Sequence, residues 1–176
     1  AWIAQRPHFL AAELDKYYDV TVVYLKVCLK RWKSQTAVMK TSKSRHGIYF
    51  PLQEKIPIFQ AISDSSFRRA IGDINDYDIV WIGSPLYLKL LESFNGKVIY
   101  ACMDNNSEFA DSEKRRLEIL ALEDALIKRA DHIVCSSRYL CDAIQNRGGH
   151  EKTSLIRNGF RSKEVHEVSV PKKKAR

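Results

Sequence analysis

The sequence predicts an α/β protein in which helices cover both faces of a mainly parallel β-sheet, a three-layer α/β/α fold. Segments typical of strands and of helices alternate along nearly the whole chain, as they do in parallel sheets. Residues 98–103 read V-I-Y-A-C-M without any alternation of apolar and polar side chains, which is typical of a strand covered on both faces. With 176 residues, the chain is long enough for one ordinary domain and too short for two.

The first predicted element is a helix that begins at Arg6-Pro7, because proline is tolerated in a first helical turn. Apolar side chains recur on one of its faces, namely Phe9, Leu10, Leu14 and Tyr17. A β-branched strand follows at residues 20–25. A helix with no strand before it is an unusual start for such a domain, so we expect a first strand upstream of Ala1.

The segment 26–45 is basic, with seven Lys or Arg and no acidic residue. Its apolar residues show poor periodicity, and we expect it to be irregular or weakly helical. A short strand at residues 47–51 ends at a proline, and a helix is expected after Pro57, up to Asn75. Residues 78–83, D-I-V-W-I-G, form the next predicted strand.

The second half of the chain repeats this alternation. A short helix at 86–92 precedes the strand at 98–103, and Asp111 or Ser112 caps a long helix that runs to Arg129. Its predicted inner face consists of Ile119, Leu122, Leu126 and Ala130. The last predicted elements are a strand at 132–136, a helix at 138–147 ended by Gly148, and a strand at 153–157. We expect one domain over residues 1–159 and a linker over residues 160–176.

Composition excludes several classes of protein. Apolar runs fall short of the roughly 20 residues that a membrane span needs, and no signal peptide is visible, so we expect a cytoplasmic protein. The four cysteines share no C-x-x-C spacing, and Cys102 and Cys135 fall in predicted buried strands, which indicates reduced thiols. The five histidines are scattered singly, and this spacing argues against a structural zinc site.

The net charge of +8 predicts attraction to an anionic partner such as nucleic acid, a phosphate-bearing substrate or an acidic membrane surface. Much of the excess lies in segment 26–45, and we take Lys26, Lys30, Arg31 and Lys33 as a candidate membrane or anion surface. A solvated loop explains the same charge run equally well.

Polar residues follow four of the predicted strands. Because the carboxyl ends of parallel strands meet at one edge, these residues predict a ligand site there. They are Ser84, Asp104, Asn105, Ser136, Ser137 and Asn158, and Arg6 and Arg157 can add positive charge to the same rim. Turns and helix caps are the alternative role for each residue taken singly.

Asp104 is the candidate catalytic residue of this group. An ionised carboxylate accepts hydrogen bonds from two or more hydroxyl groups, so Asp104 can orient a sugar hydroxyl or accept its proton. The helix that begins at Ser137 would present free backbone N–H groups to a phosphate or another anion. An Asx turn at Asp104 and plain capping by Ser137 remain the structural alternatives.

Three segments together resemble the N-terminal domain of GT-B glycosyltransferases, in the retaining family that includes bacterial polysaccharide and teichuronic acid transferases. They are Q-R-P-H-F-L-A-A-E-L at 5–14, the stretch from Y-D-I-V-W-I-G-S-P-L to V-I-Y-A-C-M-D-N at 77–105, and the stretch from L-I-K-R-A-D-H-I-V-C-S-S to S-L-I-R-N-G at 126–159. The resemblance implies a Rossmann-like domain that forms one half of a GT-B fold.

The resemblance also implies a division of labour. The first domain of such enzymes holds the acceptor, here a glycan or a polyprenyl-diphosphate-linked acceptor, and a second domain holds the nucleotide sugar. This chain resembles the first domain alone and has no E-x7-E pair of the kind associated with donor binding. We therefore expect no cofactor in this domain, no hexosyltransferase activity without the donor domain, and a peripheral location on the inner face of the membrane.

The chain differs at several positions from the GT-B enzymes that it resembles. They often carry acidic residues where Ala101 and Asn105 stand, and proline where Arg157 stands. Asp104 is thus the sole carboxylate of its cluster. If the enzyme retains anomeric configuration, as the resemblance implies, the donor phosphate itself assists the acceptor proton and Asp104 only positions the acceptor. Asp76-Tyr77-Asp78 has the D-x-D spacing of metal-dependent sugar transferases of another fold, but it enters its strand instead of leaving it.

A non-enzymatic α/β module that binds nucleic acid is the competing hypothesis. Readers of RNA or single strands place stacking aromatics within a basic surface. Here most aromatics fall on predicted core faces, which argues against this hypothesis; these include Phe9, Tyr17, Phe67, Trp81 and Tyr100.

Overall fold

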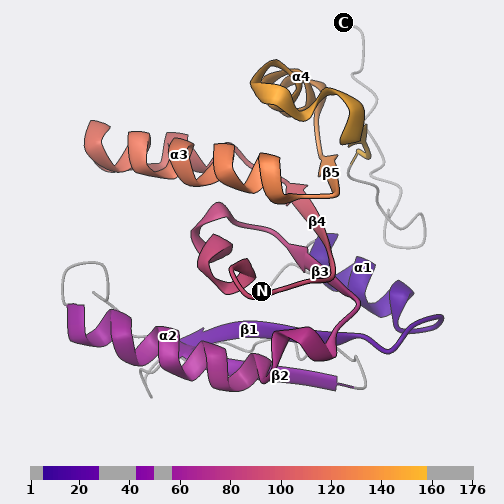
Figure 1. The fold of residues 1–176 in the computed structure, drawn as a ribbon, viewed down its shortest axis with the longest axis vertical. Coiled ribbons are helices and arrows are strands. Elements are labelled where there is room, and N and C mark those ends of the chain that lie inside the picture. Colours follow the sequence, from indigo (N-terminus) through magenta and orange to yellow (C-terminus); the bar gives the residue numbers. More distant parts are fainter. Residues whose placement is uncertain (1–5, 28–42, 50–56, 158–176) are drawn as a thin grey trace, which may run out of the picture.

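The computed structural model describes residues 6–27, 43–49 and 57–157. It has the predicted α/β architecture, a Rossmann-like arrangement of parallel strands with helices on either side (Figure 1). The helices α2 (Pro57–Ile71), α3 (Glu113–Arg129) and α4 (Arg138–Ile144) lie on one side of the strands, and α1 (Arg6–Leu14) lies on the other. The three-layer prediction is confirmed.

The strands form two parallel sheets. The smaller sheet pairs β1 (Thr21–Val27) with β2 (Lys43–Tyr49). The larger sheet has the order β3-β4-β5-β6, with every neighbouring pair parallel. Its strands are β3 (Ile79–Ile82), β4 (Lys97–Cys102), β5 (His132–Cys135) and β6 (Thr153–Leu155).

Strand order explains where the connecting helices lie. Because β3 to β6 follow one another in sequence, right-handed crossovers place all of their connections on the same face. These connections are the 3-10 segments η2 (Pro85–Leu91) and η3 (Asn106–Phe109), then α3, α4, a wide π turn at Gln145–Gly149 and a 3-10 turn at His150–Lys152. A further 3-10 turn, η1 (Ile74–Asp76), enters β3.

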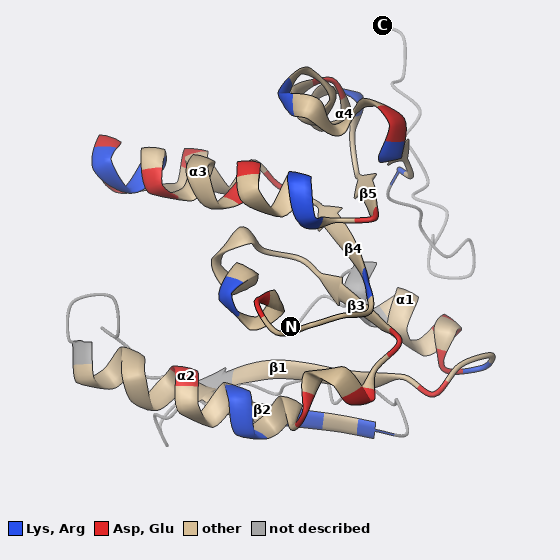
Figure 2. Ribbon diagram, viewed as in Figure 1, with Lys and Arg blue, Asp and Glu red and all other residues tan. Residues whose placement is uncertain are grey.

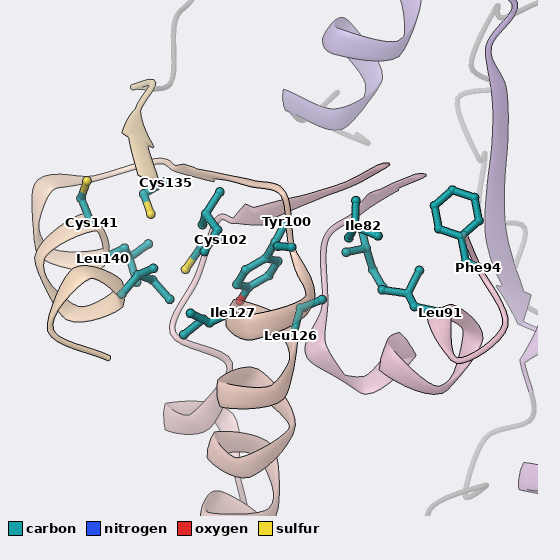
Figure 3. Close-up of a cluster of buried hydrophobic side chains, with 14 residues drawn as sticks. Ile82, Leu91, Phe94, Tyr100, Cys102, Leu126, Ile127, Cys135, Leu140 and Cys141 are labelled. Carbon is teal, nitrogen blue, oxygen red and sulfur yellow. The ribbon is translucent and has the colours of Figure 1, made fainter. Parts of the chain in front are cut away.

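The core lies between that face of the larger sheet and the helices (Figure 3). Val98, Tyr100 and Ile133 project from β4 and β5 and are 0% exposed. Leu126 and Ile127 of α3 are equally buried against them. Val98 to Cys102 of β4 are buried or half-buried at every position, as the unbroken apolar sequence predicts.

Local sequence signals set the ends of several elements. Ser112 caps α3 by accepting a hydrogen bond from the Arg115 N–H at 3.3 Å, so Ser112 and not Asp111 is the cap. Gly148 has a φ of 97°, in the left-handed region that glycine enters most easily, and it ends the run of helical backbone after α4. Gly72, with a φ of 79°, ends α2 in the same way.

Several expectations need correction. Both described ends of segment 26–45 are strand, not irregular or helical, because β1 extends to Val27 and β2 begins at Lys43. The predicted helix after Pro57 ends at Ile71, before Asn75. Two aromatics assigned to the core are exposed, Tyr17 by 74% and Trp81 by 38%, because Tyr17 follows the end of α1 and Trp81 projects from the sheet face opposite the core.

The turn that leads into β4 predicts a stability difference between two glycines. A Cβ atom at Gly96 would lie 2.4 Å from the Phe94 ring and 2.6 Å from the Asp78 carbonyl oxygen, whereas one at Gly83 would meet nothing within 4 Å. We expect Gly96→Ala to lower the free energy of unfolding by about 1–3 kcal/mol, as overpacking does. Gly83→Ala, the control, should change it by less than about 0.5 kcal/mol. Urea denaturation followed by circular dichroism measures both, and equal effects would contradict the described turn.

Candidate functional site

The carboxyl edge of the larger sheet carries the predicted polar rim. Ile82 pairs with Tyr100 and Cys102 pairs with Cys135, so the residues that follow β3, β4 and β5 leave the sheet at the same edge. The rim residues Ser84, Asp104, Asn105, Ser136 and Ser137 all follow these strand ends. The D-x-D segment Asp76 to Asp78 precedes β3 and lies at the opposite edge, as predicted.

Asp104 is the most available polar group of the rim. It is exposed, and its carboxylate has no hydrogen bond or ion pair with any other residue in the described ranges. Its main-chain oxygen accepts a hydrogen bond from the Asn106 side chain at 3.4 Å. Because the carboxylate has no structural partner there, it can accept hydrogen bonds from the hydroxyl groups of a ligand without losing others.

Ser136 joins the ends of β4 and β5. Its hydroxyl donates to the Met103 carbonyl oxygen at 2.8 Å, and its N–H donates to the Cys102 carbonyl oxygen at 3.1 Å. These bonds hold the segment that carries Asp104 against the end of the neighbouring strand. The hydroxyl oxygen of Ser136 still has acceptor capacity for a ligand.

The other rim residues have clear local roles. Ser84 caps η2 through a 3.4 Å hydrogen bond from the Leu86 N–H, and Ser137 caps α4 through a 3.3 Å bond from the Leu140 N–H. The α4 helix has only seven residues, so its dipole is weak, and this favours capping over anion binding at Ser137. Asn105 accepts from the Ser107 hydroxyl at 2.8 Å and donates to Glu108 at 3.4 Å.

The remaining predicted site residues lie outside the described ranges or near their ends. Asn158, Lys30, Arg31 and Lys33 lie outside the described residues. Arg6 begins α1 and Lys26 lies in β1, but only their backbone is described. Arg157 is exposed just after β6.

A cavity of about 200 Å³ adjoins the rim between α3 and α4. Asn105 belongs to both the rim and the cavity wall, which also includes Cys102, Glu108, Arg116, Glu123 and Arg147. Glu108 and Arg116 bring opposite charges to this wall, and Arg116 is held by two 2.7 Å hydrogen bonds to Glu113. The wall also includes the apolar side chains of Leu120, Leu140, Ala143 and Ile144, so the cavity has mixed polarity and its charges are close to balanced.

A buried polar network lines the floor of this cavity. The Tyr100 hydroxyl donates to a carboxylate oxygen of Glu123 at 2.6 Å, and the guanidinium of Arg147 donates to the other oxygen. Arg147 also donates to Asp124 at 2.8 Å and to the Leu120 carbonyl oxygen at 3.0 Å. The network thus ties β4, α3 and the turn after α4 together.

Ionisation in this network follows from burial and charge. Burial, followed by the nearby Cys102 and Glu123, raises the pKa of Tyr100, so its phenol remains a hydrogen-bond donor. Burial alone would lower the pKa of Arg147, but the hydrogen bonds and charges of Glu123 and Asp124 raise it above its ordinary value. Tyr100 stays neutral and Arg147 stays charged, and both donate to Glu123.

Three cysteines lie beside this network in the core (Figure 3). Cys102, Cys135 and Cys141 are free thiols and are buried, which confirms the predicted burial of the first two. The hydrogen bond between Cys102 and Cys135 lowers the pKa of Cys102, although burial alone would raise it. The same hydrogen bond raises the pKa of Cys135, and burial raises it further. They pack as small apolar side chains.

Glu123 is an inner residue of α3 that the sequence pattern did not predict. The inner face was expected to include Leu122, but the buried positions are Ile119, Glu123, Leu126 and Ile127. These positions are four, three and one residues apart, which is the spacing of one helix face. The glutamate among them was the feature of the sequence that could have pointed to a buried partner. A charged residue on an apolar face indicates a buried partner, here Arg147.

Within the described ranges, no group of three or more His, Cys, Asp or Glu side chains is placed to hold a metal ion. None of the described helices has the length and apolar composition needed to cross a membrane. No protein-family model matches the chain, and no curated protein matches it significantly.

The buried network predicts unequal effects of two neighbouring acidic residues. Both Glu123 and Asp124 bind Arg147, but the Glu123 side chain is 5% exposed and that of Asp124 is 50% exposed. Glu123→Ala leaves Tyr100 and Arg147 without their buried acceptor, so we expect a loss of about 3 kcal/mol in the free energy of unfolding. Asp124→Ala, the matched control, should cost less than about 1 kcal/mol.

Chemical denaturation of the two variants checks this difference. A loss for Glu123→Ala no larger than that for Asp124→Ala would contradict the described network.

Proposed function

We propose that this chain is the acceptor-binding half of a glycosyltransferase that transfers a sugar from a nucleotide-sugar donor to a glycan or lipid-linked acceptor in cell-surface polysaccharide biosynthesis. The observation that carries the proposal is the exposed carboxylate of Asp104 at the carboxyl edge of a parallel sheet. Ligands of open α/β sheets bind at this edge. The resemblance of three sequence segments to GT-B enzymes supplies the choice of a carbohydrate.

The rim has the chemistry that a sugar acceptor requires. Sugar hydroxyl groups need acceptors and donors at fixed positions, and Asp104 supplies an ionised acceptor. Ser136 lies beside it and is fixed by two hydrogen bonds to the end of β4, so the acceptor hydroxyl would meet a rigid surface. Asp104 would either take the proton of the acceptor hydroxyl or only position that hydroxyl. In the second case, the donor phosphate would take the proton.

The division of labour between domains follows from the same proposal. The nucleotide sugar would bind a C-terminal donor domain, and this chain would bind acceptors without transferring sugar to them. We therefore propose a hexosyltransferase whose acceptor half is inactive alone and lies on the inner face of the membrane.

Membrane contact would come from the basic segment with Lys26, Lys30, Arg31 and Lys33. At its C-terminal end, Lys43 pairs with Asp19 and Arg45 donates to the Ile71 carbonyl oxygen, so these two cations already have partners on the protein. Figure 2 shows the Lys and Arg positions of β2 in blue. The proposed membrane surface therefore rests on the preceding lysines and arginine.

Asp104→Asn tests the acceptor site. We expect it to weaken binding of a short-chain prenyl diphosphate that carries one N-acetylhexosamine by about tenfold, since a hydrogen bond to a charged group contributes about 1.5–3 kcal/mol. Stability should not change, because the carboxylate has no partner among the described residues. Isothermal titration calorimetry measures the affinity.

The matched control is Asp111→Asn, because Asp111 is also an exposed aspartate and lies after η3 on the same connection. It should bind the probe as the unsubstituted chain does. Unchanged affinity in Asp104→Asn, or an equal loss in both variants, would contradict the assigned role of Asp104. The same prenyl diphosphate without its sugar separates binding of the glycan from binding of the phosphate.

A nucleic-acid-binding module is the second candidate, and one observation favours it. Tyr17 is 74% exposed and Tyr18 is 68% exposed, so the expectation that Tyr17 lies in the core no longer counts against base stacking. The net charge of +8 supplies the attraction.

Filter binding to a single-stranded oligonucleotide distinguishes the two candidates. The glycosyltransferase proposal predicts weak binding that Tyr17→Ala leaves unchanged. Tight, salt-sensitive binding that is lost in Tyr17→Ala would favour the nucleic-acid module.

A further inference from the structure

The ends of β4 and β5 place two thiols next to each other in the core. Cys102 is the last residue of β4, Cys135 is the last residue of β5, and the two are partners in the register of this parallel pair. Both belong to the core cluster under the helices, so their side chains project from the same face of the sheet (Figure 3). Both are free and at most 1% exposed. Their sulfur atoms are therefore neighbours.

The spacing of this pair suits a disulfide bond. Neighbouring strands of a sheet lie about 4.8 Å apart, and disulfides join residues whose Cα atoms are about 4.4–6.8 Å apart. Cys102 and Cys135 can therefore be linked without displacement of their strands. The Cβ atoms of paired residues lie about as far apart as the strands, which exceeds the mean of about 3.8 Å found in disulfides. A bond that is strained in this way is easily reduced again.

The cavity between α3 and α4 reaches one thiol of this pair. Among the three described cysteines, only Cys102 lies on its wall. With a volume of about 200 Å³, the cavity has room for a small polar molecule such as hydrogen peroxide, since one water takes up about 30 Å³ in the liquid. A small oxidant therefore reaches Cys102 first, although Cys141 is the more exposed thiol, by 7% against 1%.

The surroundings give the two thiols different roles. The Cys135 thiol donates a hydrogen bond to the Cys102 sulfur, and this bond lowers the pKa of Cys102, although burial and the charge of Glu123 act to raise it. A hydrogen bond from Tyr100 and the positive charge of Arg147 also act to lower it. The same hydrogen bond between the thiols raises the pKa of Cys135, so this thiol keeps its proton. Because the thiolate is the nucleophile, Cys102 is the attacking thiol.

We propose that Cys102 and Cys135 form an oxidation site, at which hydrogen peroxide admitted through the cavity produces a reversible disulfide bond. The Cys102 thiolate attacks one peroxide oxygen, so an S–O bond forms, the O–O bond breaks, and the leaving hydroxide takes up the proton that Cys102 has lost. The Cys135 sulfur then attacks the sulfur of the resulting sulfenic acid. The S–S bond forms, and the hydroxyl group leaves with the proton of Cys135 as water. Peroxide gains the two electrons that the thiols lose, and a dithiol reductant returns them by exchange.

The disulfide bond lies next to the polar rim. Asp104 follows Cys102 by two residues, and Ser136 follows Cys135 directly. The Cys102 thiol donates to the Asp104 carbonyl oxygen at 4.0 Å, and this hydrogen bond is lost when the thiol is oxidised. Oxidation therefore changes what holds the main chain at Asp104. The oxidation site itself does not depend on whether the rim binds a glycan.

Peptide mapping by mass spectrometry tests the pairing. The folded, reduced chain is treated with hydrogen peroxide, and its remaining thiols are alkylated before digestion. We expect one main disulfide, between Cys102 and Cys135, that dithiothreitol removes. With dimedone present to trap sulfenic acid, label should appear on Cys102 at least about tenfold faster than on Cys141. Cys141 is the internal control, because it is buried but lies off the cavity wall.

Two variants separate the roles of the second thiol and of the cavity. Cys135→Ala removes the thiol that consumes the sulfenic acid, so dimedone should label Cys102 in higher yield. Ala143→Leu narrows the cavity without altering a thiol, and it should slow the labelling of Cys102 by about tenfold because access to the thiol is reduced. Ala125→Leu is the matched control, because Ala125 is exposed on α3 and lies off the cavity wall. It should leave the labelling rate unchanged.

Three results would overturn the proposal. The first is a main disulfide that joins Cys135 to Cys141, or one that includes Cys28, which lies outside the described residues. The second is dimedone labelling of Cys141 as fast as that of Cys102, or no reaction of either thiol in the folded chain. The third is an equal labelling rate in Ala143→Leu and Ala125→Leu.

Discussion

Parallel hydrogen-bonded pairing of β3, β4, β5 and β6 in consecutive order is the constraint on which the rest of the structure depends. Parallel strands end at one common edge, so the polar residues that follow them are brought to one rim whatever their distance in sequence. The same order, with right-handed crossovers, sends α3 and α4 to one face and encloses the core there. Both the rim and the core follow from a single topological rule.

The buried network around Glu123 connects the elements that flank this rim. It links Tyr100 on β4 to α3 and to Arg147 beyond α4, and these elements also form the wall of the cavity next to Asn105. A charge buried in this way is costly unless every partner is in place, and here the carboxylate has a donor on each oxygen. The network therefore fixes the relative positions of the helices that flank the rim.

Sequence periodicity predicts the elements that are buried on both faces or amphipathic. The unbroken apolar run of β4 and a helix capped at Asp111 or Ser112 that runs to Arg129 were both predicted from local residues alone, because packing and capping agree there. Strand pairing is not local, and this is why segment 26–45 was expected to be irregular although its two described ends are parallel strands. Trp81 was misplaced because apolar composition does not reveal which sheet face is covered, and Tyr17 was misplaced because α1 ends at Leu14, before the helical spacing reaches Tyr17.

The common rim could be predicted from the sequence, but its internal contacts could not. Strand ends mark Ser84, Asp104 and Ser136, whereas only the structure shows that Ser84 caps η2, that Ser136 binds the end of β4 and that Asp104 is exposed. Glu123 and Arg147 are 24 residues apart, so their pairing depends on how α3 and α4 pack.

We propose that residues from neighbouring strand ends form one carbohydrate-binding rim. NMR chemical-shift mapping with the prenyl diphosphate that carries one N-acetylhexosamine tests it most directly. We expect the amides of Ser84, Asp104 and Ser136 to shift together with one dissociation constant, while those of Asp78 and Lys97 at the opposite edge do not shift. Shifts at the opposite edge, or rim residues that respond with different affinities, would contradict it.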